Sequence, residues 1–288
     1  MTTIAFIGLG NMGGPMAANL ATAGHEVRGY DVVPEACDRA RQNGITVCAD
    51  PAEAADGATV IITSLPNGGL VSQVLTPLFA PDLLFIDCST IAVDEARTLA
   101  DAASAAGARF LDAPVSGGIA GAAAGTLAFM VGGDEAAFAE ATPLLDVMGR
   151  SVTHCGATGT GQAVKACNNM ILAVQQIALS EALVLGERLG LSHQAFYDVV
   201  ANATGSSWSL TVNAPVPDVV PTSPANNEFK PGFASALMLK DLKLAMAAAE
   251  STGTDTVLGR IAAEQYAAFV DEGNGGLDFS AIINEVRG

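Results

Sequence analysis

A glycine-rich turn between a short apolar run and a helical stretch constrains this chain more than any other feature. Residues 3 to 8 form the apolar run, Gly8-Leu9-Gly10-Asn11-Met12-Gly13 follows, and a helical pattern begins near residue 14. Glycines at these three positions allow a tight turn, close approach of backbone to a pyrophosphate, and close packing of helix on strand. Free N–H groups at the helix start then face the phosphates. The pattern predicts a dinucleotide-binding turn made by Gly8, Gly10, Asn11, Met12 and Gly13.

A carboxylate at the end of the second predicted strand indicates which dinucleotide binds. Asp31 closes the strand over residues 26 to 31 and lies 18 residues beyond Gly13, near the spacing of an acid that binds the adenosine ribose hydroxyls. It would repel a 2′-phosphate, and Val32, Val33 and Pro34 supply no compensating arginine. We therefore expect NAD rather than NADP. The alternative is that Asp31 is only a polar residue that ends a strand.

The first half of the chain alternates short strand signals with alanine-rich helical stretches, which is typical of a mostly parallel sheet covered by helices. The strand signals lie at residues 3–8, 26–31, 58–63, 83–87, 109–112, 126–131 and 150–154. The helical stretches between them lie at residues 14–23, 35–42, 92–106 and 134–147.

After about residue 158 only helical patterns remain, at residues 161–189, 193–202, 233–251, 254–272 and 278–286. The segment 161–189 carries too many polar residues for a membrane span and predicts one long helix. The proline-rich stretch 213–232 is expected to be an ordered loop. We predict an α/β fold: a Rossmann-type NAD-binding domain over 1–160, joined by a long helix to an all-α substrate and oligomerisation domain over 161–288.

Composition excludes several classes of partner. The formal net charge is −17, with 30 acidic against 13 basic side chains, which argues against binding of nucleic acid or of an anionic membrane. Five scattered cysteines without a paired spacing predict neither a disulfide framework nor a metal site, and favour a reducing compartment. A buried strand at the very start of the sequence makes export improbable, so we expect a cytoplasmic protein.

Four motifs resemble the β-hydroxyacid dehydrogenase family and extend over most of the chain. They are Phe6-Ile7-Gly8-Leu9-Gly10-Asn11-Met12-Gly13, Asp112-Ala113-Pro114-Val115-Ser116-Gly117-Gly118, Gly159-Thr160-Gly161-Gln162-Ala163-Val164-Lys165 with Asn168-Asn169, and Met238-Leu239-Lys240-Asp241-Leu242. Narrower signals look like the hydroxyisobutyrate branch of the family: Ser207-Trp208-Ser209, Asn213 to Pro217, and Ala225-Asn226-Asn227.

Lys165 is the leading candidate for the group that takes the hydroxyl proton as hydride leaves an alcohol carbon. It is one of only four lysines and lies near the start of the predicted long helix, with Asn168 and Asn169 on the same face. An ordinary lysine has a pKa of about 10.4, so burial or a nearby positive charge would have to lower that pKa. The resemblance implies that Lys165 is catalytic and that Asn169 is its hydrogen-bonding partner. A helix cap or a snorkelling lysine is the alternative.

The resemblance also implies the remaining site residues. Ser116, Gly117 and Gly118 would bind substrate, although Val-Ser-Gly-Gly is also an ordinary turn. Lys240 would reach the cofactor, although it could be a solvated charge. Apart from the resemblance, Trp208 and Phe233 are aromatics that could wall the substrate pocket, with Phe233 also expected to contact the cofactor, and as isolated aromatics both could instead be core residues. The other expected cofactor contacts are Leu65, Pro66, Leu70 and Thr90, at or near the carboxyl ends of strands.

The resemblance implies NAD-dependent oxidation of 3-hydroxyisobutyrate to methylmalonate semialdehyde, a step of valine breakdown, and we expect a homodimer or homotetramer. A tartronate semialdehyde reductase, or another short β-hydroxyacid dehydrogenase, would use the same serine turn and lysine. A decarboxylating sugar-phosphate dehydrogenase would carry a histidine where this chain has Asn168, and more arginines. A non-catalytic nucleotide sensor on the same fold is the alternative from another class, which loss of the lysine would have indicated.

Overall fold

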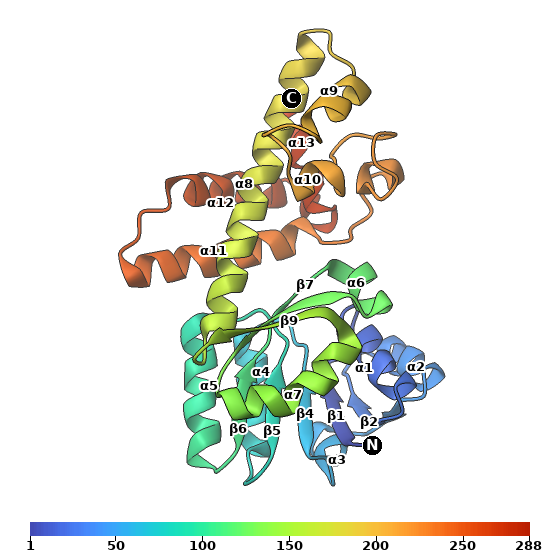
Figure 1. Cartoon of the computed structure of the whole chain (residues 1–288), viewed down its shortest axis with the longest axis vertical. Coiled ribbons are helices and arrows are strands. Elements are labelled where there is room, and N and C mark those ends of the chain that lie inside the picture. The colour runs from blue at the N-terminus through green and yellow to red at the C-terminus, as the bar shows by residue number, and fades with distance from the viewer. The chain divides into compact units, whose positions relative to one another are not determined.

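The computed structural model describes residues 1–288, which divide into two compact units, Met1–Lys165 (unit 1) and Ala166–Gly288 (unit 2) (Figure 1). Helix α8 (Thr160–Arg188) begins in unit 1 and continues into unit 2. The expected long helix at this point of the chain is confirmed.

Unit 1 contains a nine-stranded sheet with the order β3-β2-β1-β4-β5-β6-β8-β7, and β9 pairs with β8. The strands are β1 (Thr3–Ile7), β2 (Glu26–Tyr30), β3 (Thr46–Val47), β4 (Val60–Thr63), β5 (Leu84–Asp87), β6 (Arg109–Asp112), β7 (Val115–Ser116), β8 (Leu127–Gly132) and β9 (Gly149–Gly156). Pairing is parallel from β3 through β6 and between β8 and β9, and antiparallel where β8 meets β6 and β7. The predicted Rossmann-type, mostly parallel sheet is confirmed.

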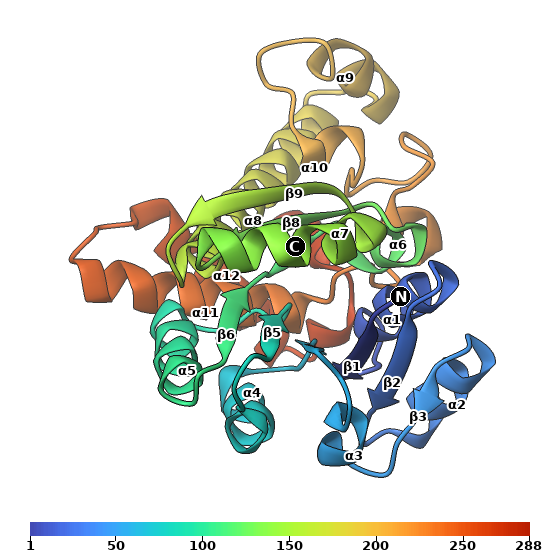
Figure 2. The ribbon, with the colours of Figure 1, turned by 60° about the horizontal axis from the view of Figure 1, so that its bottom comes forward.

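Helices cover both faces of this sheet, because successive side chains of a strand point to opposite sides. Ile4 and Phe6 of β1 belong to one core cluster, whereas Ala5 and Ile7 belong to the other. On the first face lie α1 (Gly13–Thr22), α2 (Pro34–Gln42), α6 (Gly118–Ala124) and α7 (Glu135–Met148). On the second lie α3 (Pro51–Ala55), α4 (Gly68–Leu75), the 3-10 turn η1 (Thr76–Leu78) and α5 (Val93–Ala105). Figure 2 shows α7 on one side of the strands, with α4 and α5 on the other.

The strand order places the switch point of the sheet at β1, which has β2 on one side and β4 on the other. In open sheets of this kind, ligands bind beyond the carboxyl ends of the strands at such a point. The glycine-rich turn follows β1, and Ser64-Leu65-Pro66 follow β4. The topology alone therefore puts the predicted cofactor contacts of unit 1 at one edge.

Unit 2 contains only helices and loops, as predicted for the all-α domain. After α8 come α9 (His193–Val200), α10 (Trp208–Thr211), α11 (Ser235–Thr252), α12 (Val257–Asp271) and α13 (Ile283–Arg287), with 3-10 turns η2 (Pro224–Asn227), η3 (Asn274–Gly276) and η4 (Phe279–Ile282). Side chains of α8 such as Ala173 and Ile177 pack with α11 and α12 around the fully buried Tyr266.

Helix α8 is also long and apolar enough to cross a membrane, judged by length and composition alone. In the most apolar window, 44% of its residues are buried inside the structure. The core helix of a folded domain has the same two properties, and the contacts of α8 in unit 2 account for its apolar face.

The proline-rich stretch 213–232 is an ordered loop, as expected. It contains one 3-10 turn, η2, and side-chain hydrogen bonds hold its backbone. The Ser223 hydroxyl donates to the Ala214 carbonyl at 2.5 Å, and the Asn226 amide donates to the Val220 carbonyl at 2.9 Å. These local bonds replace the helical ones that proline prevents.

Several short elements were not predicted from the sequence: β3, β7, α3, α4, α6 and α10. The signals for α4 and α6 are weak because glycines occupy their starts and α6 is almost entirely glycine and alanine. Asn67 was the readable signal for α4, because its side chain caps that helix by accepting from the Leu70 N–H at 2.9 Å.

Candidate active site

The glycine-rich turn has the shape that the sequence predicts. Gly8 has φ +96°, and a Cβ there would lie 2.3 Å from the Ser64 carbonyl oxygen. A Cβ on Gly13 would lie 1.9 Å from the Gly8 carbonyl oxygen. Both glycines are therefore required by the protein's own backbone, at the crossing of β1, α1 and the loop after β4.

Gly10 differs from Gly8 and Gly13, the other two glycines of this turn. A Cβ added to it would meet no atom within 4 Å, so the fold itself does not require glycine there. The residue is exposed just before α1, and its carbonyl accepts the Gly14 N–H at 2.9 Å. The open space at Gly10, next to the positive end of the helix dipole, fits a pyrophosphate, so the residues present fit a dinucleotide.

Asp31 is tied to that same turn. One carboxylate oxygen accepts from the Leu9 N–H at 2.6 Å, and the other accepts from the Val33 N–H at 2.8 Å. The Gly8 N–H donates to the Tyr30 carbonyl at 2.9 Å, immediately before Asp31. The carboxylate thus holds the glycine-rich turn against the end of β2, and its two oxygens have further lone pairs with which to accept ribose hydroxyls.

A buried polar network lies at the carboxyl ends of β4 and β5. The Thr63 hydroxyl donates to Oδ1 of Asp87 at 2.7 Å, and the Ser89 N–H donates to the same oxygen at 3.1 Å. The Ser89 hydroxyl accepts from the Leu65 N–H at 2.8 Å, so this network fixes the loop where cofactor contacts at Leu65 and Pro66 were expected.

Asp87 itself is fully buried, and its Oδ2 has no hydrogen-bond partner. Burial raises the pKa of this carboxyl from 3.8 to about 6, although the hydrogen bonds from Ser89 and Thr63 act to lower it. The lack of solvation therefore makes this carboxyl harder to ionise than an ordinary aspartate.

Asp112, the first residue of the second motif, holds the start of α8. Its Oδ1 accepts from the Gly159 N–H at 2.7 Å, and its Oδ2 accepts from the Gln162 N–H at 2.9 Å. Burial raises the pKa of Asp112, while these backbone donors oppose the rise. A helix start whose N–H groups meet a carboxylate is stabilised by both hydrogen bonding and the helix dipole.

Lys165 lies on the second turn of α8 and is only 7% exposed. Asn169, one turn further along the same helix, is 2% exposed. In unit 2, the Asn169 amide donates to Oδ2 of Asp241 at 2.5 Å and accepts from the Asn168 amide at 2.9 Å. Asp241 also forms an ion pair with Lys240 at 3.5 Å. The structure thus assigns partners to Asn169 and Lys240 that the sequence alone did not.

Ser116, Gly117 and Gly118 occupy the expected turn between β7 and α6. Gly117 has φ +135° and Gly118 has φ +63°, conformations that explain why side chains are absent at both positions. Ser116 pairs with Ala128 of β8, which orients the turn relative to the sheet.

The two aromatic candidates differ. Trp208 is 50% exposed, so it is not a core residue. Phe233 is half-buried and packs edge-to-face on Phe279, with ring centroids 5.8 Å apart. Phe233 is therefore at least partly a core residue of unit 2.

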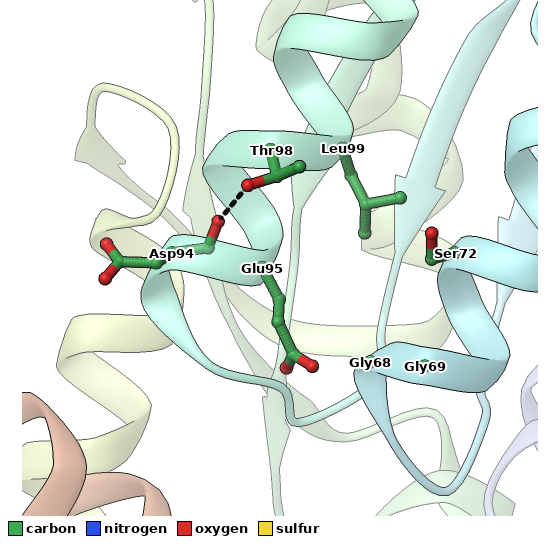
Figure 3. Close-up of a pocket in the computed structure, with 7 residues that line it drawn as sticks. All are labelled: Gly68, Gly69, Ser72, Asp94, Glu95, Thr98 and Leu99. Atoms are coloured by element: carbon green, nitrogen blue, oxygen red, sulfur yellow. Dashed lines mark hydrogen bonds between the residues drawn. The ribbon is translucent and has the colours of Figure 1, made fainter.

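A cavity of about 330 Å³ opens in unit 1 between the start of α4 and the start of α5 (Figure 3). Its walls include Gly68, Ser72 and Glu95, but not Leu70, the expected cofactor contact on the same helix. The Glu95 carboxylate points toward Gly68, where an added Cβ would meet it at 2.2 Å, and it accepts from the Ala92 N–H at 2.8 Å. Glu95 thus fills the space beside the loop after β4.

Sequence reasoning missed four buried polar residues near these positions: Asp87, Asp112, Gln162 and Asp241. Three of them stood inside motifs that were quoted, but no role was given to them. The available signal was a charged or amide side chain inside an otherwise apolar stretch, which predicts a buried group with specific partners.

Comparisons with known proteins agree with this geometry. Residues 3–156 match the family model described as the NAD binding domain of 6-phosphogluconate dehydrogenase. Residues 159–286 match the model described as NAD-binding of NADP-dependent 3-hydroxyisobutyrate dehydrogenase.

Curated relatives match along their whole length. A probable 3-hydroxyisobutyrate dehydrogenase of Mycobacterium tuberculosis is 55% identical over 290 residues, covering 100% of this chain and 98% of the relative. An NAD-dependent L-serine dehydrogenase of Pseudomonas aeruginosa is 42% identical, covering 98% and 97%. The solved structure of Mycobacterium tuberculosis 3-hydroxyisobutyrate dehydrogenase with L-serine has a TM-score of 0.95 at 54% identity, covering 100% of both chains.

These matches distinguish between the classes considered above. Relatives this similar are dehydrogenases, which removes the basis for a non-catalytic sensor. The dinucleotide turn, the buried lysine and the full-length matches together lead to one conclusion. The chain belongs to the β-hydroxyacid dehydrogenase family and is an NAD-dependent β-hydroxyacid dehydrogenase.

Proposed function

We propose that this enzyme oxidises 3-hydroxyisobutyrate to methylmalonate semialdehyde, a step of valine breakdown. The observation that carries the proposal is the 55% identity, over the entire chain, to a relative named for this activity. Bound NAD would accept a hydride from the alcohol carbon, which becomes an aldehyde carbon. Lys165 would take the hydroxyl proton as the hydride departs, and Asn169 would orient the lysine or the substrate hydroxyl.

L-serine is the second candidate substrate, because one relative is named an L-serine dehydrogenase and one similar structure holds L-serine. The two substrates share a primary alcohol β to a carboxylate. They differ in the α-substituent, which is a methyl group in one and an ammonium group in the other. Ser116 and the glycines after it would bind the common carboxylate through a hydroxyl and backbone N–H groups.

The deciding experiment measures NADH formation with both enantiomers of 3-hydroxyisobutyrate, L-serine and D-glycerate. We expect kcat/KM to be highest for 3-hydroxyisobutyrate. A higher value for L-serine would reassign the substrate. A higher value for D-glycerate would favour a tartronate semialdehyde reductase.

We propose that the enzyme prefers NAD to NADP, because the Asp31 carboxylate occupies the end of β2 and already accepts two backbone N–H groups. A 2′-phosphate would add negative charge beside it. Comparing kcat/KM for the two cofactors tests this preference, and equal or higher efficiency with NADP would overturn it.

We further propose a cytoplasmic homo-oligomer. All five cysteines are free, as in proteins of reducing compartments. Unit 2 exposes apolar side chains on α8 and α12, among them Ile171 at 53% and Leu258 at 64%. Sedimentation at several concentrations would test the assembly, and cell fractionation would test the location.

A further inference from the structure

The side chain of Gln162 brackets a single residue of the loop that follows β5. Its Nε2 donates to the Ser89 carbonyl at 2.8 Å, and its Oε1 accepts from the Ile91 N–H at 3.2 Å. The residue between these two contacts is Thr90, an expected cofactor contact. Gln162 is 1% exposed, so water does not compete for either hydrogen bond. We call this pair of contacts the Gln162 clamp.

The backbone of α8 that carries the Gln162 side chain is also fixed in place. The Gln162 backbone N–H donates to Asp112, and Gly161 packs so closely that a Cβ there would lie 2.3 Å from the Met130 carbonyl oxygen. The first turn of α8 therefore has one position relative to β6 and β8. Through Gln162, the loop after β5 takes its position from that helix turn.

Lys165 follows Gln162 by three residues on α8, which places both side chains on the same face of the helix. One buried amide thus joins the segment expected to contact the cofactor to the helix turn that carries the expected proton acceptor. Hydride and proton transfer require the cofactor and the proton acceptor to be held in a fixed relative position, since a displacement of about 1 Å can lower the rate about 100-fold.

We propose that Gln162 is a positioning residue, which sets Lys165 relative to the Thr90 segment without touching substrate or cofactor. The proposal rests on the proposed dehydrogenase function. An amide suits the role because it offers a donor and an acceptor side by side, as the Ser89 carbonyl and the Ile91 N–H require.

The first test is Gln162→Leu, which preserves approximate size and removes both hydrogen bonds. We expect kcat to fall by about 10- to 100-fold, with a much smaller change in KM for NAD. Gln175→Leu is the matched control, because Gln175 is an exposed residue of the same helix. An unchanged kcat in Gln162→Leu would overturn the proposal.

The second test is Gln162→Glu, measured as the ratio of variant to parent kcat at several pH values. A protonated glutamic acid can donate to the Ser89 carbonyl and accept from the Ile91 N–H. In the ionised form, a carboxylate oxygen would instead face the Ser89 carbonyl oxygen, and the two would repel each other. Burial and the buried carboxylates of Asp87 and Asp112 favour the protonated form, while a positive charge on Lys165, where it is protonated, opposes them. We expect the ratio to be near one at low pH and to fall as pH rises. A ratio independent of pH would contradict the clamp.

The third measurement does not depend on activity. Hydrogen exchange of the Ile91 amide in the cofactor-free protein should be faster in Gln162→Leu than in the parent, and unchanged in Gln175→Leu. Faster exchange with unchanged kcat would make the clamp purely structural and overturn its positioning role. A parent without NAD-dependent activity on any β-hydroxy acid would instead refute the proposed function, while hydrogen exchange would still report on the clamp.

Discussion

Two regions at the carboxyl ends of the unit 1 strands are held by different means. The dinucleotide turn, Gly8 to Gly13, is fixed by missing side chains, since Gly8 and Gly13 approach backbone oxygens too closely for a Cβ. The second region, the polar network, is the set of buried polar groups that joins the loop after β5 to the start of α8. It is fixed by buried side chains, chiefly Asp87, Asp112 and Gln162. The first region leaves no room for side-chain atoms at two glycines, and in the second region buried side chains supply hydrogen-bond partners to backbone groups. Substitutions should therefore disturb them in different ways.

The largest effect should come from the residue that the polar network supports. Lys165→Ala removes the proposed proton acceptor, so kcat should fall by about 10²- to 10⁴-fold. Steady-state NADH formation at saturating substrate checks this. Lys230→Ala is the control, since Lys230 is exposed on the loop of unit 2. Turnover within a few-fold of the parent would exclude Lys165 from the chemistry.

The next effect tests the turn itself. Gly13→Ala places a Cβ against the Gly8 carbonyl, so the backbone must shift, and we expect a loss of about 3 kcal/mol in the free energy of unfolding. Urea unfolding would measure it. A parent-like midpoint would show that the turn is softer than its contacts indicate.

Gly10→Ala is the matched contrast, because its Cβ meets no protein atom. Its unfolding free energy should equal that of the parent, while the Kd for NADH rises because the methyl group occupies the phosphate cradle. Fluorescence titration would measure the Kd. Unchanged binding would mean that the pyrophosphate does not approach Gly10.

Asp112→Asn addresses the polar network. The amide can accept from only one of the Gly159 and Gln162 N–H groups, and its own NH₂ faces the other donor. We expect a loss of about 1–3 kcal/mol in the free energy of unfolding. Asp94→Asn, at an exposed position, should change stability much less. A stable Asp112→Asn variant would show that the start of α8 is held by packing alone.

The smallest effect is a pH dependence. The pKa of Asp87 is about 6 in the folded protein against 3.8 for an ordinary aspartate, so folding favours its protonated form. The stability that this group contributes is present at low pH and is lost as pH rises through about 6. The free energy of unfolding of Asp87→Asn, relative to that of the parent, should therefore rise by about 1 kcal/mol between about pH 5 and about pH 7. Denaturant unfolding at several pH values tests this, and a constant difference would contradict the raised pKa.

The same contrast explains how much the sequence could predict. The dinucleotide turn is local: six consecutive residues contain its signal, and the structure has a tight strand–turn–helix connection there. The polar network is not local, since Gln162 bonds to residues 71 and 73 positions earlier and Asp112 to residues 47 and 50 positions later. Fold class followed from strand and helix alternation, whereas these pairings depend on which strands become neighbours. Short elements such as α6 escaped because glycine and alanine carry little periodic signal.

The hydrogen bond from the Leu9 N–H to Asp31 has a consequence for cofactor engineering. To accept a 2′-phosphate, the acid at this position would have to be replaced with a neutral or basic residue, because a carboxylate repels the phosphate. Here the same carboxylate anchors the turn that would bind the pyrophosphate common to both cofactors. A replacement of Asp31 chosen only to accept a 2′-phosphate would therefore weaken the binding of both NAD and NADP. A successful switch would need a second acceptor for that N–H, so selectivity and affinity cannot be tuned separately in this protein.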